Sequence, residues 1–303
     1  MNKGCPICNS INYRIYYEKV FNYQHANIVQ CEKCGHIYSL VTEDVNTDEL
    51  YNDEVYRVVE NRDSVFDRIL DWEYTRVIKK INTLLPAKGS LLDFGSGKGK
   101  FGWLAAKDKW QVKCVETSIS RSEYARTVYH LDVTTEFYRN GRIFENLFDV
   151  ITLFHVLEHL PRPMELTCAL TRDNLNRDGL LIIEVPNIES WQSTFAKEKW
   201  IHLDVPRHIN HFTNKRLAQM IEDIGFSHVK TSFFSFHLGV LGMVDSLFKL
   251  FGYKKNIIFE LKNRKTIGLI LKIAIFLPVA MILECVAAWS SKGGIIRMYL
   301  KYK

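Results

Sequence analysis

Three alternating glycines have the clearest chemical meaning in this sequence. Gly95, Gly97 and Gly99 follow the short apolar run that ends at Phe94, and the residues after them have helical character. Glycines in this arrangement let a strand turn tightly into a helix and let the backbone approach a ligand closely. The unpaired N–H groups at the start of the helix would point into the same crevice. The pattern therefore predicts a nucleotide-type pocket.

Two acidic residues lie where such a pocket needs them. Asp93 precedes the first glycine by two positions, and Glu116 follows that glycine after 21 residues, at the end of a second predicted strand. An acidic side chain at this second position can accept hydrogen bonds from both ribose hydroxyls. The dinucleotide fingerprint would place its third glycine where the sequence has Lys100. The pattern D-x-G-x-G-x-G thus indicates a different nucleotide cofactor, and the alternative is an ordinary strand-to-helix turn.

Four cysteines near the N-terminus have the spacing of a zinc ribbon. Cys5 and Cys8 form one C-x2-C pair, and Cys31 and Cys34 form a second pair after 22 intervening residues. Four thiolates at such spacing bind Zn²⁺ tetrahedrally. We expect a structural zinc ribbon over residues 1–40, with a redox C-x-x-C pair as the alternative reading.

The other cysteines and the nearby histidines are not expected to bind this metal. His25 and His36 are predicted to be surface residues. Cys114, Cys168 and Cys285 lie in apolar patterns that are typical of small core residues.

The elements that must position these residues alternate between strand and helix. Asp63 is a plausible N-cap for the first long helix, and Pro86 follows its end. The predicted strands are 12–19 and 26–30 in the ribbon, then 90–94, 111–115, 131–135, 148–153, 180–185, 229–236 and 295–302, and the predicted helices are 63–85, 100–107, 120–129, 163–177 and 215–224. This alternation predicts an α/β fold with a doubly wound parallel sheet that ends in an antiparallel hairpin.

The glycine pattern resembles motif I of the class I S-adenosylmethionine (SAM) dependent methyltransferases. The run FDVITLFHVLEHLPRP, from Phe148 to Pro163, resembles the fourth motif of the same superfamily. The later segment P-R-H-x-x-H-F-T, from Pro206 to Thr213, is similar to a branch often associated with cell-surface glycan pathways. The resemblance covers about residues 88–236 and the last strand. It implies a seven-stranded Rossmann-like sheet preceded by a zinc ribbon, with a methyltransferase domain over residues 63–303.

The resemblance also implies which residues hold the cofactor. SAM is expected to contact Asp93, Gly95, Ser96, Gly97, Gly99 and Glu116, with Phe154 and His155 beside its methionine end.

The segment His155-Val-Leu-Glu158-His159 allows two metal readings. H-x-x-E-H matches an inverted zinc-protease motif, but that motif needs a helix and the sequence breaks it at once. In the related ubiquinone-pathway O-methyltransferases the corresponding E-x-x-E-H carries a divalent ion, and here His155 replaces the first glutamate. The alternative is a structural hydrogen-bonding role for Glu158 and His159.

His208 and His211 are the candidates for a catalytic base. They lie past a predicted strand, on the sheet edge where ligands of open parallel sheets bind. An imidazole titrates near neutral pH and could deprotonate a hydroxyl acceptor. The alternative is that His211 and Thr213 cap and order the loop.

Residues 237–293 form a long apolar insertion before the last strand. Lys272, Pro278 and Glu284 interrupt its most apolar part, and residues 273–283 make up only about half of the length that a membrane span requires. From residue 245 onward the chain has eleven Lys or Arg and three acidic residues, so the rest of the chain is slightly acidic although the net charge is +6. We expect residues 240–290 to lie on a membrane surface, with a lid or a homodimer interface as the alternative.

The resemblance, together with the apolar insertion, implies an O-methyltransferase that acts on a sugar or lipid-linked saccharide. No signal peptide is visible, so we expect a cytoplasmic protein at the inner face of the membrane. Residues 41–62 are expected to be a polar connector. The alternatives are an rRNA or tRNA methyltransferase and a non-catalytic module that binds SAM and zinc. The ribbon has few basic residues, so we expect no nucleic acid partner.

Overall fold

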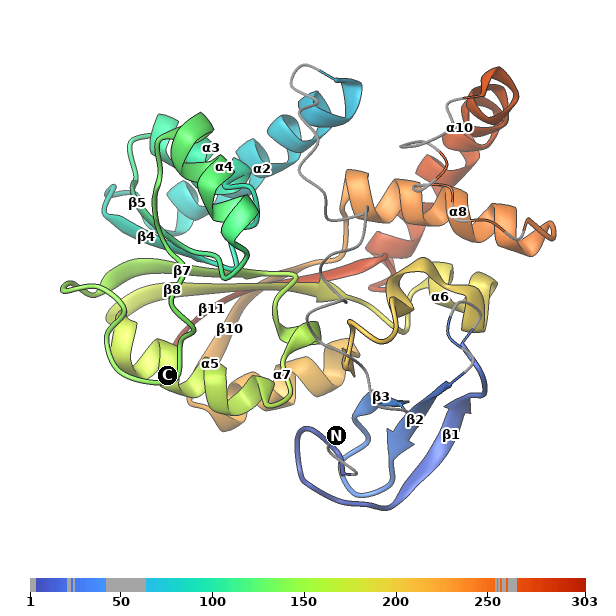
Figure 1. Cartoon of the computed structure of the whole chain (residues 1–303), viewed down its shortest axis with the longest axis horizontal. Coiled ribbons are helices and arrows are strands. Elements are labelled where there is room, and N and C mark those ends of the chain that lie inside the picture. Colours follow the sequence, from blue (N-terminus) through green and yellow to red (C-terminus); the bar gives the residue numbers. More distant parts are fainter. Residues whose placement is uncertain are drawn as a thin grey trace.

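The computed structural model shows a seven-stranded sheet at the centre of the fold (Figure 1). The described residues are 4–20, 23, 25–41, 64–253, 255, 257, 260 and 266–303. The strand order is β10-β11-β8-β7-β4-β5-β6, in which the five strands from β8 to β6 are parallel and β11 is antiparallel to both neighbours. The strands are β4 (Ser90–Phe94), β5 (Gln111–Val115), β6 (Asp132–Thr134), β7 (Phe148–Phe154), β8 (Leu175–Pro186), β10 (Phe226–Ser232) and β11 (Ile295–Tyr302). The predicted parallel sheet with a final antiparallel hairpin is confirmed.

Helices cover both faces of this sheet. One face carries α2 (Val65–Leu84), α3 (Lys100–Lys107) and α4 (Ile119–Tyr129), and the other carries α5 (Pro163–Asn174) and α7 (Asn214–Asp223) (Figure 1). Successive side chains of a strand point to opposite faces, so neighbouring residues of β8 enter different cores. Ile182 packs in a cluster with Ile81 of α2. Ile183 packs in the opposite cluster with Leu170 of α5 and Leu217 of α7.

Several element boundaries differ from the prediction, among them the start of α2 and the end of α5. The N-cap of α2 is Ser64, whose Oγ accepts a hydrogen bond in the first turn, whereas the predicted cap Asp63 lies outside the described residues. The helix predicted to extend to residue 177 is α5, and it ends at Asn174 because Leu175 pairs with Phe148 and begins β8. At residues 175–177 the pairing of β8 with β7 therefore determines the structure, although the sequence pattern favours a helix.

The N-terminal segment forms a second, antiparallel sheet. Its strands are β1 (Tyr13–Tyr17), β2 (Ala26–Cys31), β3 (Ile37–Val41) and β9 (Asn210–His211), in that order. The sequence predicted β1 and β2 and missed β3 and β9. Ile37 pairs with His211 and Tyr38 with Asn210, so the ribbon is built onto a loop that follows β8. The predicted connector 41–62 lies outside the described residues apart from its first residue, which ends β3.

The expected burial of three single residues was wrong. His36 is fully buried, and its Nε2 lies 2.9 Å from Asn210 Oδ1, because β9 covers this side of the ribbon. Cys114 is buried as expected, but Cys168 and Cys285 are exposed on the outer sides of their helices.

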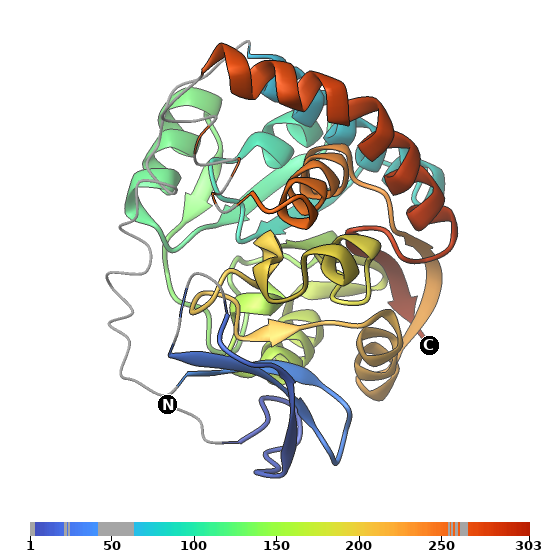
Figure 2. The ribbon, with the colours of Figure 1, turned by 90° about the vertical axis from the view of Figure 1, so that its right-hand side faces the viewer.

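The insertion between β10 and β11 is helical and lies at the carboxyl ends of the parallel strands (Figures 1 and 2). It contains a π-helical turn η4 (Phe236–Val240), α8 (Leu241–Leu250) and α10 (Ile267–Trp289), and α6 (Trp191–Ala196) packs against α8. Helix α10 continues through Lys272, Pro278 and Glu284, the three residues that interrupt the apolar pattern in the sequence. Among the described helices, α10 is the one whose length and composition would suit a membrane crossing.

One side of α10 is apolar and exposed. Figure 2 shows the helix at the outer edge of the molecule, with α8 beneath it. Ile275 is 71% exposed and Ile282 is 65% exposed. We call this side the α10 stripe; its members are Ile267, Ile270, Leu271, Ile275, Val279, Ile282, Val286 and Trp289. The opposite side buries Leu269 and Ala280 against α8.

Candidate functional site

The glycine turn connects β4 to α3. Gly95, Gly97 and Gly99 have φ values of +76°, +56° and +80°, in the left-handed region that favours glycine. The N–H groups of Gly95 and Ser96 donate to Val115 O at 2.8 and 3.0 Å, which ties the turn to the end of β5. A Cβ on Gly95 or Gly99 would lie 2.6 or 2.7 Å from the nearest side-chain atom, whereas a Cβ on Gly97 would meet nothing within 4 Å. Gly97 therefore faces open space.

Glu116 lies directly beside this turn. Its Oε2 accepts a hydrogen bond from Gly97 N at 2.8 Å, and its Oε1 accepts one from Ser118 N at 2.8 Å. A carboxylate oxygen has two lone pairs, so each oxygen can still accept a hydrogen bond from a hydroxyl group. The structure thus brings the predicted glycine and acidic residues together.

Asp93 is buried beneath the same turn. Its Oδ1 accepts a hydrogen bond from Thr152 Oγ1 at 2.8 Å, while Oδ2 has no hydrogen-bond partner among the described residues. Burial, together with the negative charge of Glu116, raises the pKa of Asp93 to about 7. An unpartnered buried carboxylate oxygen is costly unless a ligand pairs with it.

These three features fit the cofactor that the motif implies. SAM carries ribose hydroxyls, an ammonium group and a positively charged sulfur. Glu116 offers acceptors for the hydroxyls, Asp93 Oδ2 offers an acceptor for a cationic group, and Gly97 leaves room for the backbone to be approached. We expect the cofactor between the glycine turn and the ends of β5 and β7.

An aromatic cluster joins α3, the end of β7 and α2. Phe154, the last residue of β7, packs edge-to-face on Phe101 of α3 with ring centroids 4.8 Å apart. The ring of Tyr74 from α2 stacks on Phe154 at 6.4 Å. The resemblance implies that the methionine end of the cofactor lies beside Phe154, so this cluster would form an apolar wall there.

His155 is held by two carboxylates. Its Nδ1 lies 3.1 Å from Glu158 Oε1, and its Nε2 lies 2.9 Å from Glu184 Oε1. A carboxylate only accepts, so both ring nitrogens donate and the imidazole is a cation. Burial by itself lowers the pKa of His155, but the two carboxylates outweigh it and raise the pKa to about 10. His155 therefore supplies a fixed positive charge at the end of β7.

A chain of buried charges continues from His155 through the sheet to the insertion. Glu184 accepts a hydrogen bond from Arg297 Nε, and Arg297 Nη2 donates to Glu73 Oε1 at 3.1 Å. Glu73 Oε2 then lies 2.7 Å from His237 Nδ1 and accepts hydrogen bonds from the first N–H groups of η4. The chain links β7, β8, β11, α2 and η4.

The sequence analysis did not predict this series of buried charged residues. The available signal was a single arginine inside the apolar strand IIRMYL and a single glutamate on the apolar face of a helix. A lone charge in an apolar pattern indicates a buried partner, but the sequence does not say which one.

His208 and His211 lie in one segment but face different neighbours. His211 Nε2 lies 2.9 Å from Ser39 Oγ in the ribbon, and burial lowers the pKa of His211 well below its usual value. His208 is buried, with Nδ1 2.8 Å from His202 O. Thr213 caps α7 by accepting a hydrogen bond from Arg216 N. This geometry favours the ordering role for His211 that the sequence left open.

The segment H-x-x-E-H is not a zinc-protease helix. Its last three residues form a single 3₁₀ turn, η1 (Leu157–His159). The turn also binds the loop that carries β9. Asn210 Nδ2 donates to Leu157 O and Leu160 O, and Ile209 N donates to Glu158 O at 2.7 Å.

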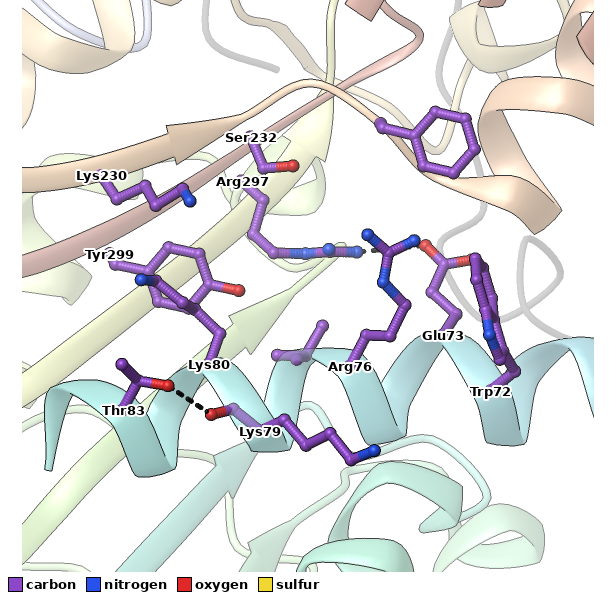
Figure 3. Close-up of a pocket in the computed structure, with 12 residues that line it drawn as sticks. Trp72, Glu73, Arg76, Lys79, Lys80, Thr83, Lys230, Ser232, Arg297 and Tyr299 are labelled. Atoms are coloured by element: carbon purple, nitrogen blue, oxygen red, sulfur yellow. Dashed lines mark hydrogen bonds and ion pairs between the residues drawn. The ribbon is translucent and has the colours of Figure 1, made fainter. Parts of the chain in front are cut away.

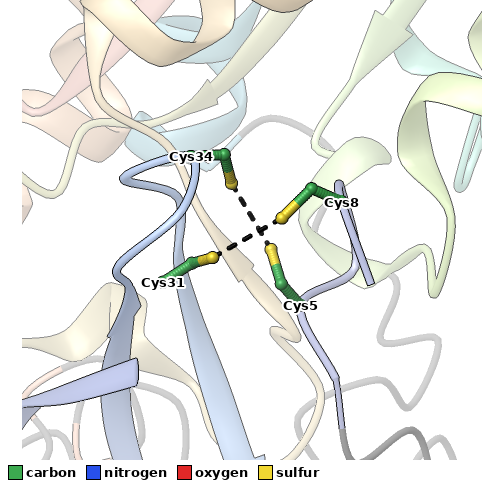
Figure 4. A group of neighbouring side chains, drawn as sticks. All are labelled: Cys5, Cys8, Cys31 and Cys34. Carbon is green, nitrogen blue, oxygen red and sulfur yellow. Dashed lines mark hydrogen bonds between the residues drawn. The ribbon is translucent and has the colours of Figure 1, made fainter. Parts of the chain in front are cut away.

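The four ribbon cysteines point at one another (Figure 4). Cys5 Sγ lies 3.6 Å from Cys34 Sγ, and Cys8 Sγ lies 3.5 Å from Cys31 Sγ. Zn–S bonds of about 2.3 Å in a tetrahedron place sulfurs about 3.8 Å apart. All four thiols are free of disulfide bonds. The group has the size and chemistry of a tetrahedral zinc site.

A separate pocket of about 370 Å³ lies between α2 and the strands β10 and β11. Figure 3 shows Arg76 and Lys80 of α2 facing Lys230 of β10 and Arg297 of β11 across it. Lys80 and Lys230 form no ion pair within the described part of the chain. The ring of Trp72 at one end packs edge-on to Phe236 of the insertion, at 6.3 Å. The pocket is thus basic and borders the insertion.

Comparison with known proteins bears on what these sites do. A family model described as a methyltransferase domain matches residues 66–231, which is more than half of the chain. No curated protein matches the chain. The matched region contains the glycine turn, Glu116 and the H-x-x-E-H segment.

Solved structures with a similar fold include two methyltransferases. A SAM-dependent methyltransferase from Archaeoglobus fulgidus superposes with a TM-score of 0.50 and 16% identity, over 84% of this chain and 100% of that chain. The plantazolicin methyltransferase BpumL, solved with a monoazolic desmethylPZN analog and S-adenosylhomocysteine (SAH), has a TM-score of 0.50 and 14% identity, over 84% of this chain and 90% of that chain. At these identities the likeness establishes the fold.

Replacing Gly97 should block the crevice without breaking the turn. Asn tolerates positive φ better than other side chains, so Gly97→Asn adds atoms to the open space at little backbone cost. We expect SAH affinity to fall about tenfold or more, measured by calorimetry. Gly141→Asn is the matched control, because Gly141 also has positive φ with nothing within 4 Å, but lies in a loop outside the crevice. Equal affinities of the two variants would contradict the assigned crevice.

Replacing Asp93 should stabilise the protein at high pH and weaken cofactor binding. Because folding raises the pKa of Asp93 from 3.8 to about 7, the stability of the parent protein falls as pH rises through this window. At pH 8 we expect the free energy of unfolding of Asp93→Asn, measured by urea denaturation, to exceed that of the parent protein by about 1–4 kcal/mol. Near pH 4 this difference should disappear. SAH affinity should fall. Asp178→Asn, with an exposed carboxylate, should show neither effect, and a pH-independent advantage of Asp93→Asn would refute the account.

Proposed function

The chain belongs to the methyltransferase-domain family and is a SAM-dependent methyltransferase, and from this premise we propose that it methylates a hydroxyl of a sugar or lipid-linked saccharide in cell-surface polysaccharide biosynthesis. The observation that carries this proposal is the basic pocket beside an insertion with an exposed apolar helix. An acceptor that joins a lipid to a saccharide through phosphate offers both kinds of contact. A neutral sugar alone would need neither.

The residues of the crevice position the methyl donor. SAM supplies a methyl group that is already activated on sulfur, so the protein need only orient the partners and exclude water. We propose that Glu116 binds the ribose hydroxyls, that Asp93 pairs with the cationic amino-acid end, and that the backbone at Gly97 lies against the cofactor. Phe154 and Phe101 then shield the reacting atoms from solvent.

The α10 stripe supports a location at a membrane surface. Its C-terminal end leads within a few residues into β11 at the carboxyl edge of the sheet, so the helix is held to the soluble domain at that end. Glu284 reinforces this, since it accepts hydrogen bonds from Gly294 N at 2.7 Å and from Gln192 Nε2 at 3.0 Å. We propose that the helix lies on the inner face of the membrane with its exposed side in the lipid.

The basic pocket supports an acceptor with phosphate. Arg76, Lys80 and Lys230 offer charge-assisted hydrogen bonds to phosphate oxygens, and Ser232 adds a hydroxyl. The pocket lies next to the insertion through the Trp72 contact, so one acceptor could span both. Lipid-linked saccharides therefore fit better than free sugars.

The ribbon has a structural part in this proposal. We propose that Cys5, Cys8, Cys31 and Cys34 bind one Zn²⁺ and thereby hold β3, on which β9 is paired. The RNA methyltransferase alternative receives less support, because the β3 edge of the ribbon is used within the chain and is not free for a partner.

The acceptor class can be tested with labelled methyl groups. Purified protein is incubated with tritiated SAM and separated glycolipid, saccharide and RNA fractions of a cell extract. We expect label in the phosphate-containing glycolipids, and a severalfold loss of label with Lys80→Ala/Lys230→Ala at unchanged SAH affinity. Gly97→Asn should abolish labelling. Label confined to RNA would overturn the proposal, and label in neutral saccharides would overturn its lipid part.

The membrane part is tested by charging the α10 stripe. Ile275→Glu/Ile282→Glu should reduce co-sedimentation with vesicles of anionic phospholipid at least severalfold, because both side chains are exposed and would place charge in the lipid. Ile11→Glu, at an exposed apolar residue of the ribbon, should sediment like the parent protein. If the parent protein ignores vesicles but the double variant shifts a dimer to a monomer in analytical ultracentrifugation, the stripe is a homodimer interface instead.

A further inference from the structure

Three side chains meet at the end of β7 with their acceptor atoms facing one another. One ligand atom each from Glu158, His159 and His208 lies within 4.8 Å of the other two. Glu158 Oε2 is fully buried and has no hydrogen-bond partner among the described residues. Such an oxygen is costly to bury without a cation or a donor beside it.

Backbone carbonyl groups determine that Nδ1 carries a proton in both imidazoles. His159 Nδ1 lies 3.1 Å from Arg207 O, and His208 Nδ1 lies 2.8 Å from His202 O. A carbonyl oxygen only accepts, so both Nδ1 atoms carry a proton, and Nε2 is the nitrogen that each ring leaves for a ligand. The cluster can therefore offer three ligand atoms to an ion, namely Glu158 Oε2 and the Nε2 atom of each histidine.

Hydrogen bonds from Nδ1 to backbone carbonyls are typical of histidines that bind a metal ion through Nε2. Metal-binding histidines usually donate their second N–H to a carbonyl or carboxylate, which fixes the ring and the tautomer. Glu158 is oriented in the same way, because its other oxygen accepts from His155 Nδ1 at 3.1 Å. His155 itself cannot be a ligand, since its two nitrogens are occupied by Glu158 and Glu184.

We propose that Glu158, His159 and His208 bind one divalent transition-metal ion. Two imidazoles and one carboxylate suit Zn²⁺, Co²⁺ or Ni²⁺ rather than Mg²⁺ or Ca²⁺. Asp204 lies beside the cluster, with Oδ2 3.7 Å from His208 Nε2, although Asp204 also pairs with Arg207. The ion would join the turn η1 to the loop that carries β9. His208 is then a metal ligand rather than the predicted general base.

Cobalt distinguishes this ion from the ribbon zinc. Full-length protein with Zn²⁺ in the ribbon is titrated with Co²⁺. We expect about one Co²⁺ per chain with weak visible d–d bands and without the intense near-ultraviolet band of a thiolate ligand. Glu158→Gln and His208→Asn should weaken this binding at least tenfold. His130→Asn, at an exposed histidine that ends α4, should bind Co²⁺ like the parent protein.

A ligand exchange guards against misfolded variants. His208→Cys keeps a ligand at the same place, so its Co²⁺ complex should gain the thiolate band that the parent complex lacks. Circular dichroism and SAH binding verify the fold of each variant. The proposal fails if the parent protein binds no Co²⁺ beyond the ribbon, or if Glu158→Gln and His208→Cys give the parent spectrum and affinity. None of these readouts depends on the acceptor.

Discussion

A continuous series of ion pairs and hydrogen bonds between charged and basic side chains joins the sheet, helix α2 and the insertion. It runs from His155 through Glu184 and Arg297 to Glu73 and ends at His237, so that each carboxylate lies beside basic side chains of other elements. Removing one member of a buried pair leaves an uncompensated charge and typically costs about 3–5 kcal/mol. The sheet, the first helix and the insertion are therefore fixed relative to one another by electrostatics as well as by packing.

The loop that carries β9 is the second joint. Asn210 connects the ribbon to the turn after β7, because its side chain reaches His36 on one side and two backbone carbonyls on the other. Ser39 donates from the ribbon to His208 O at 2.7 Å. The ribbon therefore reaches within one hydrogen bond of the proposed metal ligands, and zinc bound there would stabilise the edge of the cofactor domain.

Local patterns predicted most of the fold and the cofactor turn, and long-range pairing accounts for what they missed. The glycines and Glu116 were readable because a strand, a turn and a strand of ordinary length fix their spacing. The two-residue strand β9 has no periodicity, and its partner β3 lies far away in the sequence. Arg297 and Glu73 looked like isolated charges, since only the sheet order places them together. The roles of His208 and His211 depended on which way each ring faces, which no spacing reveals.

The position of β11 has a consequence for how the chain folds. This strand lies between β8 and β10, so the sheet cannot close until the whole insertion has been made. Helix α10 precedes β11 and must leave the ribosome before the strand that anchors it. In that interval α10 is not yet anchored to a closed sheet, and its apolar residues are exposed. Incomplete chains with such a surface aggregate readily, so we expect biosynthesis of this protein to depend on early shielding of α10, by a chaperone or by the lipid surface itself.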